Sequence, residues 1–141
     1  MLVFGKGYDH NTWSWKVRTT SNCTKLEYSY SVEYNASGQS TVKEYSDVPV
    51  SIKDGKWHHF AVSYDAPTKT VKMYLDYEKI HEFEQEEALL PNKDKVYRFG
   101  RYCSERGFSG WMDEIRLSNT VLEPQDFIKL MPSEGLTIMF R

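Results

Sequence analysis

The chain has 141 residues, of which 15% are aromatic and 27% are charged, and its formal net charge is −2 at pH 7. This length suits one core, so we predict a single domain over residues 1–141. Acidic and basic residues are interspersed, which excludes the basic footprint of a nucleic-acid-binding protein. No apolar run approaches the roughly 20 residues of a membrane-spanning helix, and we expect no membrane insertion.

The first third of the chain has the period-two alternation of β-strands. Trp13, Trp15 and Val17 lie on one side of their segment and polar residues lie on the other. Pro49 favours a sheet edge or a bend, because proline cannot donate a backbone hydrogen bond. The strands predicted here cover residues 2–6, 13–18, 26–34 and 40–45.

The clearest local signal is a β-hairpin made of residues 57–64 and 71–76, joined by a polar loop. Bulky groups occur on both faces of its first strand, so we predict that this strand is central in its sheet. One face of the strand carries Trp57, His59, Ala61 and Ser63, and the other carries His58, Phe60, Val62 and Tyr64.

The remaining elements complete an all-β pattern. Alternation predicts further strands over residues 79–83, 97–101 and 136–140, with a loop at 102–107. A helix is expected over residues 122–130, where Pro124 suits the first turn and Phe127 and Leu130 share a face. Many short strands and one short helix near the C-terminus indicate an antiparallel two-sheet β-sandwich.

Two motifs resemble those of laminin-G-like domains, which are concanavalin A-like jelly rolls. The first is Asp-Gly-Lys-Trp-His-His-Phe-Ala-Val-Ser-Tyr-Asp at residues 54–65, and the second is Phe-Ser-Gly-Trp-Met-Asp-Glu-Ile-Arg-Leu at residues 108–117. The resemblance implies that residues 111–117 form the last central strand, and we expect Trp57 and Trp111 in the core. Tyr77 stands where the family usually has glycine, and the family's first strands are missing, which indicates a fragment.

The resemblance implies a non-catalytic, lectin-like module that binds an oligosaccharide or polysaccharide. Such a module belongs to a larger exported protein that is extracellular, periplasmic or on the cell surface. The alternative is an adhesion module that binds a protein surface, and an open sheet edge would also permit dimers. A glycoside hydrolase is the weaker alternative, because the Glu-x-Asp-x-x-Glu string that supplies paired carboxyls in related glucanases is absent.

Sugar sites combine an exposed aromatic ring with a few polar groups, and two loops offer this mixture. One loop precedes the second predicted strand, and the other follows the strand at 97–101. The residues that we predict to bind the ligand are Tyr8, Asp9, His10, Trp13, Arg101, Tyr102 and Arg106.

Metal and thiol chemistry have weaker support in the sequence. His58 and His59 are neighbours in a strand, so their side chains point to opposite faces and cannot share a metal ion. The resemblance implies that Asp113 helps to hold a structural calcium ion, although one carboxylate is not a complete site. Cys23 and Cys103 permit either one disulfide or two free thiols.

Overall fold

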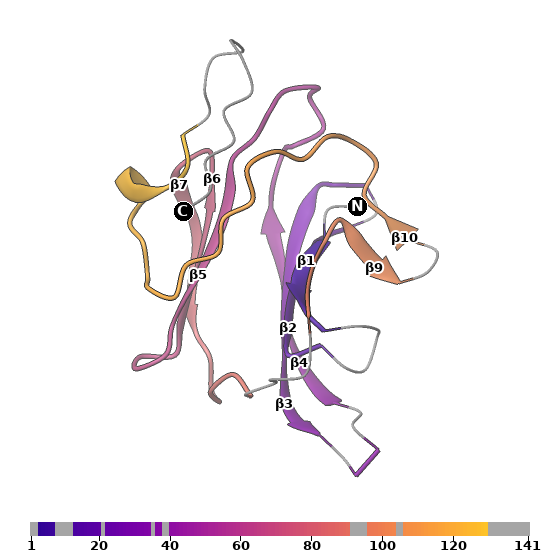
Figure 1. Ribbon diagram of the computed structural model, residues 1–141, viewed down its shortest axis with the longest axis vertical. Coiled ribbons are helices and arrows are strands. Elements are labelled where there is room, and N and C mark those ends of the chain that lie inside the picture. Colours follow the sequence, from indigo (N-terminus) through magenta and orange to yellow (C-terminus); the bar gives the residue numbers. More distant parts are fainter. Residues whose placement is uncertain are drawn as a thin grey trace. The chain divides into compact units, whose positions relative to one another are not determined.

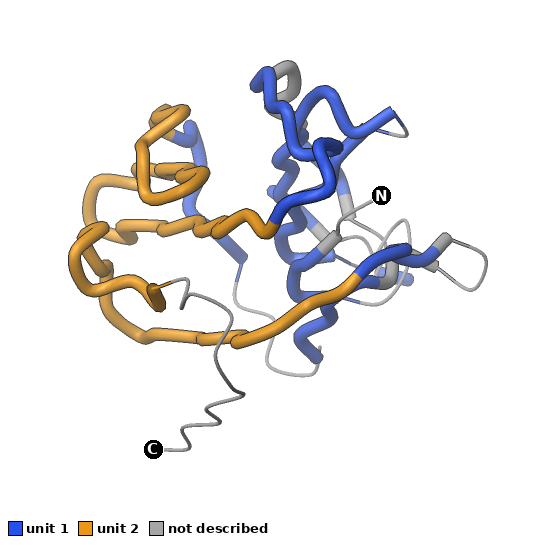
Figure 2. The backbone as a smooth tube through the Cα atoms, turned by 90° about the horizontal axis from the view of Figure 1, so that it is seen from above, with its two compact units in different colours: residues 1–56, 85–110 blue, residues 57–84, 111–141 orange. Residues whose placement is uncertain are grey.

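A computed structural model describes the backbone of residues 3–7, 13–20, 22–34, 36–37, 40–90, 96–103 and 106–129. Side chains are described for these residues except 3, 34, 40, 44–47, 101–103 and 106. The chain clusters into two compact units, Met1–Lys56 with Gln85–Gly110 and Trp57–Glu84 with Trp111–Arg141 (Figure 2). The single domain over residues 1–141 stays a prediction.

The first unit contains a five-stranded antiparallel sheet with the strand order β4-β3-β2-β1-β8 (Figure 1). The predicted strands in the first third of the chain are confirmed, and Pro49 ends a strand at the edge of the sheet. The strands are β1 (Val3–Lys6), β2 (Trp15–Thr19), β3 (Lys25–Tyr34), β4 (Ser40–Pro49) and β8 (Tyr97–Phe99).

The buried side chains of this sheet include three alternate residues of β3. Leu26, Tyr28 and Tyr30 are each 1% exposed, as expected for the apolar side of that strand. The chain after the next sheet returns to these tyrosines: Gln85 Nε2 donates to Tyr28 Oη at 2.7 Å. Tyr30 Oη donates to Glu87 Oε2 at 3.1 Å. Buried hydroxyls therefore hold residues 85–87 on the five-stranded sheet.

A two-stranded antiparallel ribbon follows β8. It consists of β9 (Arg101–Cys103) and β10 (Arg106–Gly107), so the loop predicted at residues 102–107 is wrong. Alternation failed here because the strands are too short to show a period. Cys23 carries a free thiol, 3.7 Å from Thr19 Oγ1, and the side chain of Cys103 lies outside the described residues.

The second unit contains the hairpin that the sequence predicted, extended to three antiparallel strands. These are β5 (Phe60–Asp65), β6 (Thr70–Leu75) and β7 (Glu78–Glu84), in the order β5-β6-β7. The prediction of a central first strand is wrong, because β5 lies at the sheet edge and β6 is central. Residues 111–117, which the resemblance predicted as the last central strand, form no strand.

The predicted core tryptophans are also wrong. Trp111 is 85% exposed and Trp57 is 57% exposed. Trp57 precedes the first residue of β5, and Trp111 follows Gly110 in a segment with no sheet partner among the described residues. Neither ring is therefore fixed in a sheet face.

The predicted helix over residues 122–130 is reduced to one turn of 3-10 helix, η1 (Pro124–Asp126). Phe127 already has extended backbone angles, with φ −69° and ψ 158°. The predicted strand at residues 136–140 lies outside the described residues. Among the residues whose structure is described, no helix has the length and hydropathy that crossing a bilayer requires.

Candidate functional site

The three-stranded sheet of the second unit has a polar face, which we call the outer face. Ser63 is opposite Lys72 in the β5–β6 register, and Asp65 is opposite Thr70. Lys72 is in turn opposite Glu82 in β7. Directly opposed residues of an antiparallel pair point to the same side, so these five side chains share the outer face.

The other face of the same sheet is apolar. It carries Val62, Tyr64, Val71, Met73 and Phe83, which are also paired across the strands. Val71 and Met73 are 0% exposed. Burial of the apolar face thus stabilises the sheet, and the outer face is left available to bind polar groups.

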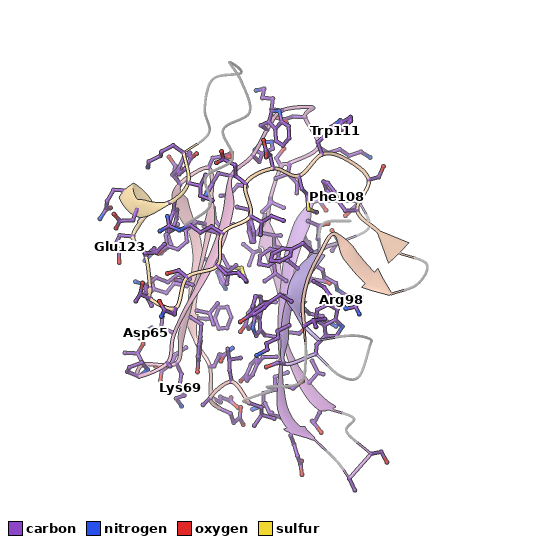
Figure 3. All side chains as sticks on the ribbon, viewed as in Figure 1. Asp65, Lys69, Arg98, Phe108, Trp111 and Glu123 are labelled. Atoms are coloured by element: carbon purple, nitrogen blue, oxygen red, sulfur yellow. The ribbon has the colours of Figure 1, made fainter. Side chains whose placement is uncertain are left out.

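A hollow of about 330 Å³ opens on the outer face. We call it the polar hollow. Its lining combines hydroxyls, carboxylates, one ammonium group and one aliphatic side chain, and Asp65 and Glu123 are both labelled in Figure 3. Thr68 Oγ1 donates to Asp65 Oδ2 at 2.8 Å, which fixes the loop between β5 and β6. The lining residues are Ser63, Asp65, Thr68, Thr70, Lys72, Glu82, Val121 and Glu123.

The charges at the hollow are partly balanced within the unit. Lys79 Nζ forms an ion pair with Glu82 Oε2. This hydrogen bond and the nearby Lys72 ammonium hold the pKa of Glu82 below its usual value, so the carboxyl is ionised at neutral pH. The hollow therefore presents carboxyl acceptors, one ammonium donor and hydroxyls that both donate and accept, which is the chemistry needed to bind a ligand with several hydroxyl groups.

A second cluster lies on the same unit, where residues 124–129 meet the β6–β7 turn. The His59 ring stacks on Tyr77, with centroids 4.5 Å apart, and on Phe127, with centroids 5.4 Å apart. Phe127 also packs edge-on against Tyr74, at 4.9 Å. Lys129 Nζ lies 4.7 Å from the centre of the Tyr77 ring. We call these five residues the aromatic clamp.

Asp76 fixes the two adjacent histidines in different ways. Its Oδ2 lies 2.8 Å from His58 Nδ1, and its Oδ1 accepts the backbone N–H of His59 at 3.0 Å. Asp76 N donates back to His59 O at 2.8 Å. The two imidazoles therefore have separate environments, one paired with a carboxylate and one stacked between aromatic rings.

In the turn after β6, Tyr77 stands where the laminin-G-like domains that the sequence resembles usually have glycine. Asp76 and Tyr77 have φ values of 50° and 71°, a combination typical of a type I′ hairpin turn. Glycine adopts this conformation without steric cost, whereas Tyr77 pays a steric cost. Its ring stacks on His59 and lies under the Lys129 ammonium. Aromatic contact thus offsets part of the backbone strain.

None of the sequence-predicted ligand residues is among the described residues that line the hollow. Trp13 is 2% exposed and lacks the open face that stacking on a sugar requires. Tyr8, Asp9 and His10 lie outside the described residues. For the other three, the structure describes only the backbone, in β9 and β10, and their role stays a prediction; they are Arg101, Tyr102 and Arg106.

Asp113, the predicted calcium ligand, is exposed, and its Oδ1 accepts the backbone N–H of Glu114 at 2.9 Å. Within the described ranges, no three His, Cys, Asp or Glu side chains are grouped to hold a metal ion. A hard cation needs six to eight oxygens, so calcium at Asp113 stays a prediction that these contacts do not test.

Sequence reasoning missed the hollow although part of its signal was present. Ser63 and Asp65 alternate with apolar residues in β5, and Lys72 alternates with Val71 and Met73 in β6. That pattern marks a polar sheet face. No local pattern indicates Glu123, because this residue is far from the hairpin in sequence and is brought to it only when the chain folds.

The comparisons with known proteins agree with this architecture. A laminin G family model, described as the concanavalin A-like lectin/glucanases superfamily, matches residues 3–127. Searches of curated proteins and of solved structures give no match. The match covers most of the chain, and the all-β, antiparallel fold class predicted from alternation is confirmed. This chain belongs to the concanavalin A-like lectin/glucanases superfamily.

Proposed function

We propose that this chain is a non-catalytic carbohydrate-binding module of a larger exported protein, and that the polar hollow is its glycan site. The observation that carries the proposal is the lining of the hollow: hydroxyls from Ser63, Thr68 and Thr70 stand beside carboxylates and an ammonium group. A sugar presents adjacent hydroxyls that each donate and accept, so a mixed lining satisfies them better than a lining of one kind.

The position of the hollow also favours binding. Most of its residues belong to paired strands or to the tight β5–β6 loop, where the register sets the side-chain spacing. Groups held in place before the ligand arrives lose little conformational entropy on binding. No aromatic ring is among the described residues that line the hollow, so recognition by them rests on hydrogen bonds and charge, with Val121 as the aliphatic contact.

Among the carboxyls that line the hollow, Glu82 is unsuited to the general-acid role of a glycosidase. A glycosidase needs one carboxyl whose pKa is raised, so that it can act as the general acid. The Lys79 hydrogen bond lowers the pKa of Glu82 instead. Outside the hollow, Glu27 is in an ion pair with Arg18 Nε. These carboxylates suit acceptor roles.

Affinity electrophoresis in gels that contain single polysaccharides tests the proposal, using a panel of neutral, acidic and amino-sugar polymers. We expect at least one polymer to retard the protein. Asp65→Ala and Lys72→Ala should each weaken that binding by about 10-fold or more, because a hydrogen bond to a charged group contributes about 1.5–3 kcal/mol. Lys53→Ala is the matched control, because Lys53 is exposed and lies outside the hollow.

Retardation that is unchanged in both hollow variants would place the glycan elsewhere. If no polymer in the panel retards the wild-type protein, the proposal fails and a protein partner becomes the better hypothesis. Release of reducing ends from any polymer would restore the hydrolase alternative.

A further inference from the structure

One segment connects the two clusters of the second unit. Val121 and Glu123 line the polar hollow, and Phe127, a few residues later, packs in the aromatic clamp. Between them, η1 is short and is tied by Lys129 Nζ, which donates to Pro124 O at 3.0 Å. Residues 121–129 are therefore held by the clamp and by Arg116 Nη1, which donates to Asp126 O at 2.8 Å, since an isolated 3-10 turn has little stability of its own.

His59 is the histidine of this clamp. Its Nδ1 is buried and has no hydrogen-bond partner among the described residues. The ring lies nearly parallel to Tyr77, at 14°, and to Phe127, at 22°. A neutral imidazole fits this site, because its unprotonated nitrogen needs no acceptor. Protonation would place a buried N–H there with nothing to receive it.

The charged groups around His59 do not remove this cost. Both Asp76 oxygens already face other groups, one the His59 backbone N–H and the other His58 Nδ1. The Lys129 ammonium sits over Tyr77, on the ring that stacks against His59. The other titratable side chains of the clamp are the phenols of Tyr77, which stacks on His59, and Tyr74, which packs edge-on against Phe127. Burial lowers the pKa of His59, Asp76 opposes that shift and Lys129 adds to it.

We propose that His59 is a pH-sensitive latch that holds residues 121–129 on the outer face of the three-stranded sheet. In its neutral form it stacks with Phe127 and keeps Val121 and Glu123 at the rim of the hollow. When it is protonated, the stack loosens and that side of the hollow is released. The latch deepens the proposed function, on which its effect on glycan binding rests.

The direction of the pH effect follows from the lowered pKa. A histidine with a lower pKa in the folded state binds its proton more weakly than in the released state. The latch is therefore complete above the ordinary value of 6.5 and is lost as the pH falls through the lowered value. Glycan binding should weaken over the same range.

Amide hydrogen exchange read by mass spectrometry tests the latch directly. Exchange in peptides that cover residues 121–129 is measured at pH 7.5 and at pH 4, after correction for the intrinsic pH dependence of exchange. We expect a severalfold loss of protection at pH 4 in the wild type. His59→Phe keeps an aromatic ring but cannot titrate, so its protection should be the same at both values. His81→Gln is the control, because His81 is exposed and outside the clamp, and should respond like the wild type.

A second variant keeps the test decisive if His59→Phe does not fold. Phe127→Ala removes the stacking partner and should leave residues 121–129 poorly protected at both pH values. The latch is refuted by protection that does not change with pH in the wild type, or by a pH response that persists in His59→Phe. Affinity electrophoresis at the two pH values separates the claims: flat exchange refutes the latch, whereas absent glycan binding with pH-dependent exchange refutes the proposed function alone.

Discussion

Gly5→Ala is expected to lower the free energy of unfolding by about 3 kcal/mol, because the sheet of the first unit has no room for a methyl group at this position. A Cβ at residue 5 would lie 2.4 Å from Trp15 O and 2.7 Å from Lys16 Cα. Both atoms belong to the backbone of β2, so no side-chain rotation can relieve the contact. β1 pairs with β2 on one side and with β8 on the other, and the added atom would force β1 away from β2.

Urea unfolding followed by circular dichroism measures this loss as a lower midpoint. Gly107→Ala is the matched control: it is also a strand glycine, but among the described residues an added Cβ there meets Gly100 O alone, at an ordinary 3.8 Å. We expect the control to remain within about 0.5 kcal/mol of the wild type. Equal stability of Gly5→Ala and the wild type would mean that β1 is not seated against β2 as described.

Met73→Ala is expected to lower the free energy of unfolding by about 2–5 kcal/mol. Met73 is 0% exposed in the central strand β6, and its neighbours across the sheet are Val62 and His81. Removing its side chain loses apolar burial and leaves a cavity that the paired backbone of a central strand cannot close.

The same denaturation measurement on Met112→Ala provides a control of identical chemistry. Met112 is 38% exposed and lies in a segment without strand pairing, so the substitution should change the unfolding free energy by less than about 0.5 kcal/mol. If both methionines behaved alike, the apolar face of the three-stranded sheet would not be the core of its unit.

Local patterns predicted the strands well where the pattern reports on the backbone itself. The hairpin at β5 and β6 was found from alternation and turn residues, and the face that carries Ser63 proved to be the one that lines the hollow. Tyr28 and Tyr30 were placed on one side of their strand and are both buried. A strand's pleat alternates side chains whatever surrounds it, so this information is present in the chain alone.

The errors arise where a local pattern needs a distant partner. Residues 111–117 match a family motif, yet they form no strand because no described strand pairs with them. The helix at residues 122–130 has suitable spacing, but Phe127 leaves helical geometry, stacks on His59 and packs edge-on against Tyr74 instead. A few tenths of a kcal/mol of helix propensity per residue cannot compete with burial of an aromatic ring.

By itself, then, the sequence determined the all-β class, the positions of most strands and the two faces of the central hairpin, because these depend on residues that are neighbours along the backbone. Only the tertiary structure decided that β1 pairs with β8, that Glu123 joins Asp65 at the hollow and that His59 is enclosed between two rings. Those outcomes require segments far apart in the chain to converge. Their convergence depends on loop closure and on the packing of the whole unit, which a periodic pattern does not encode.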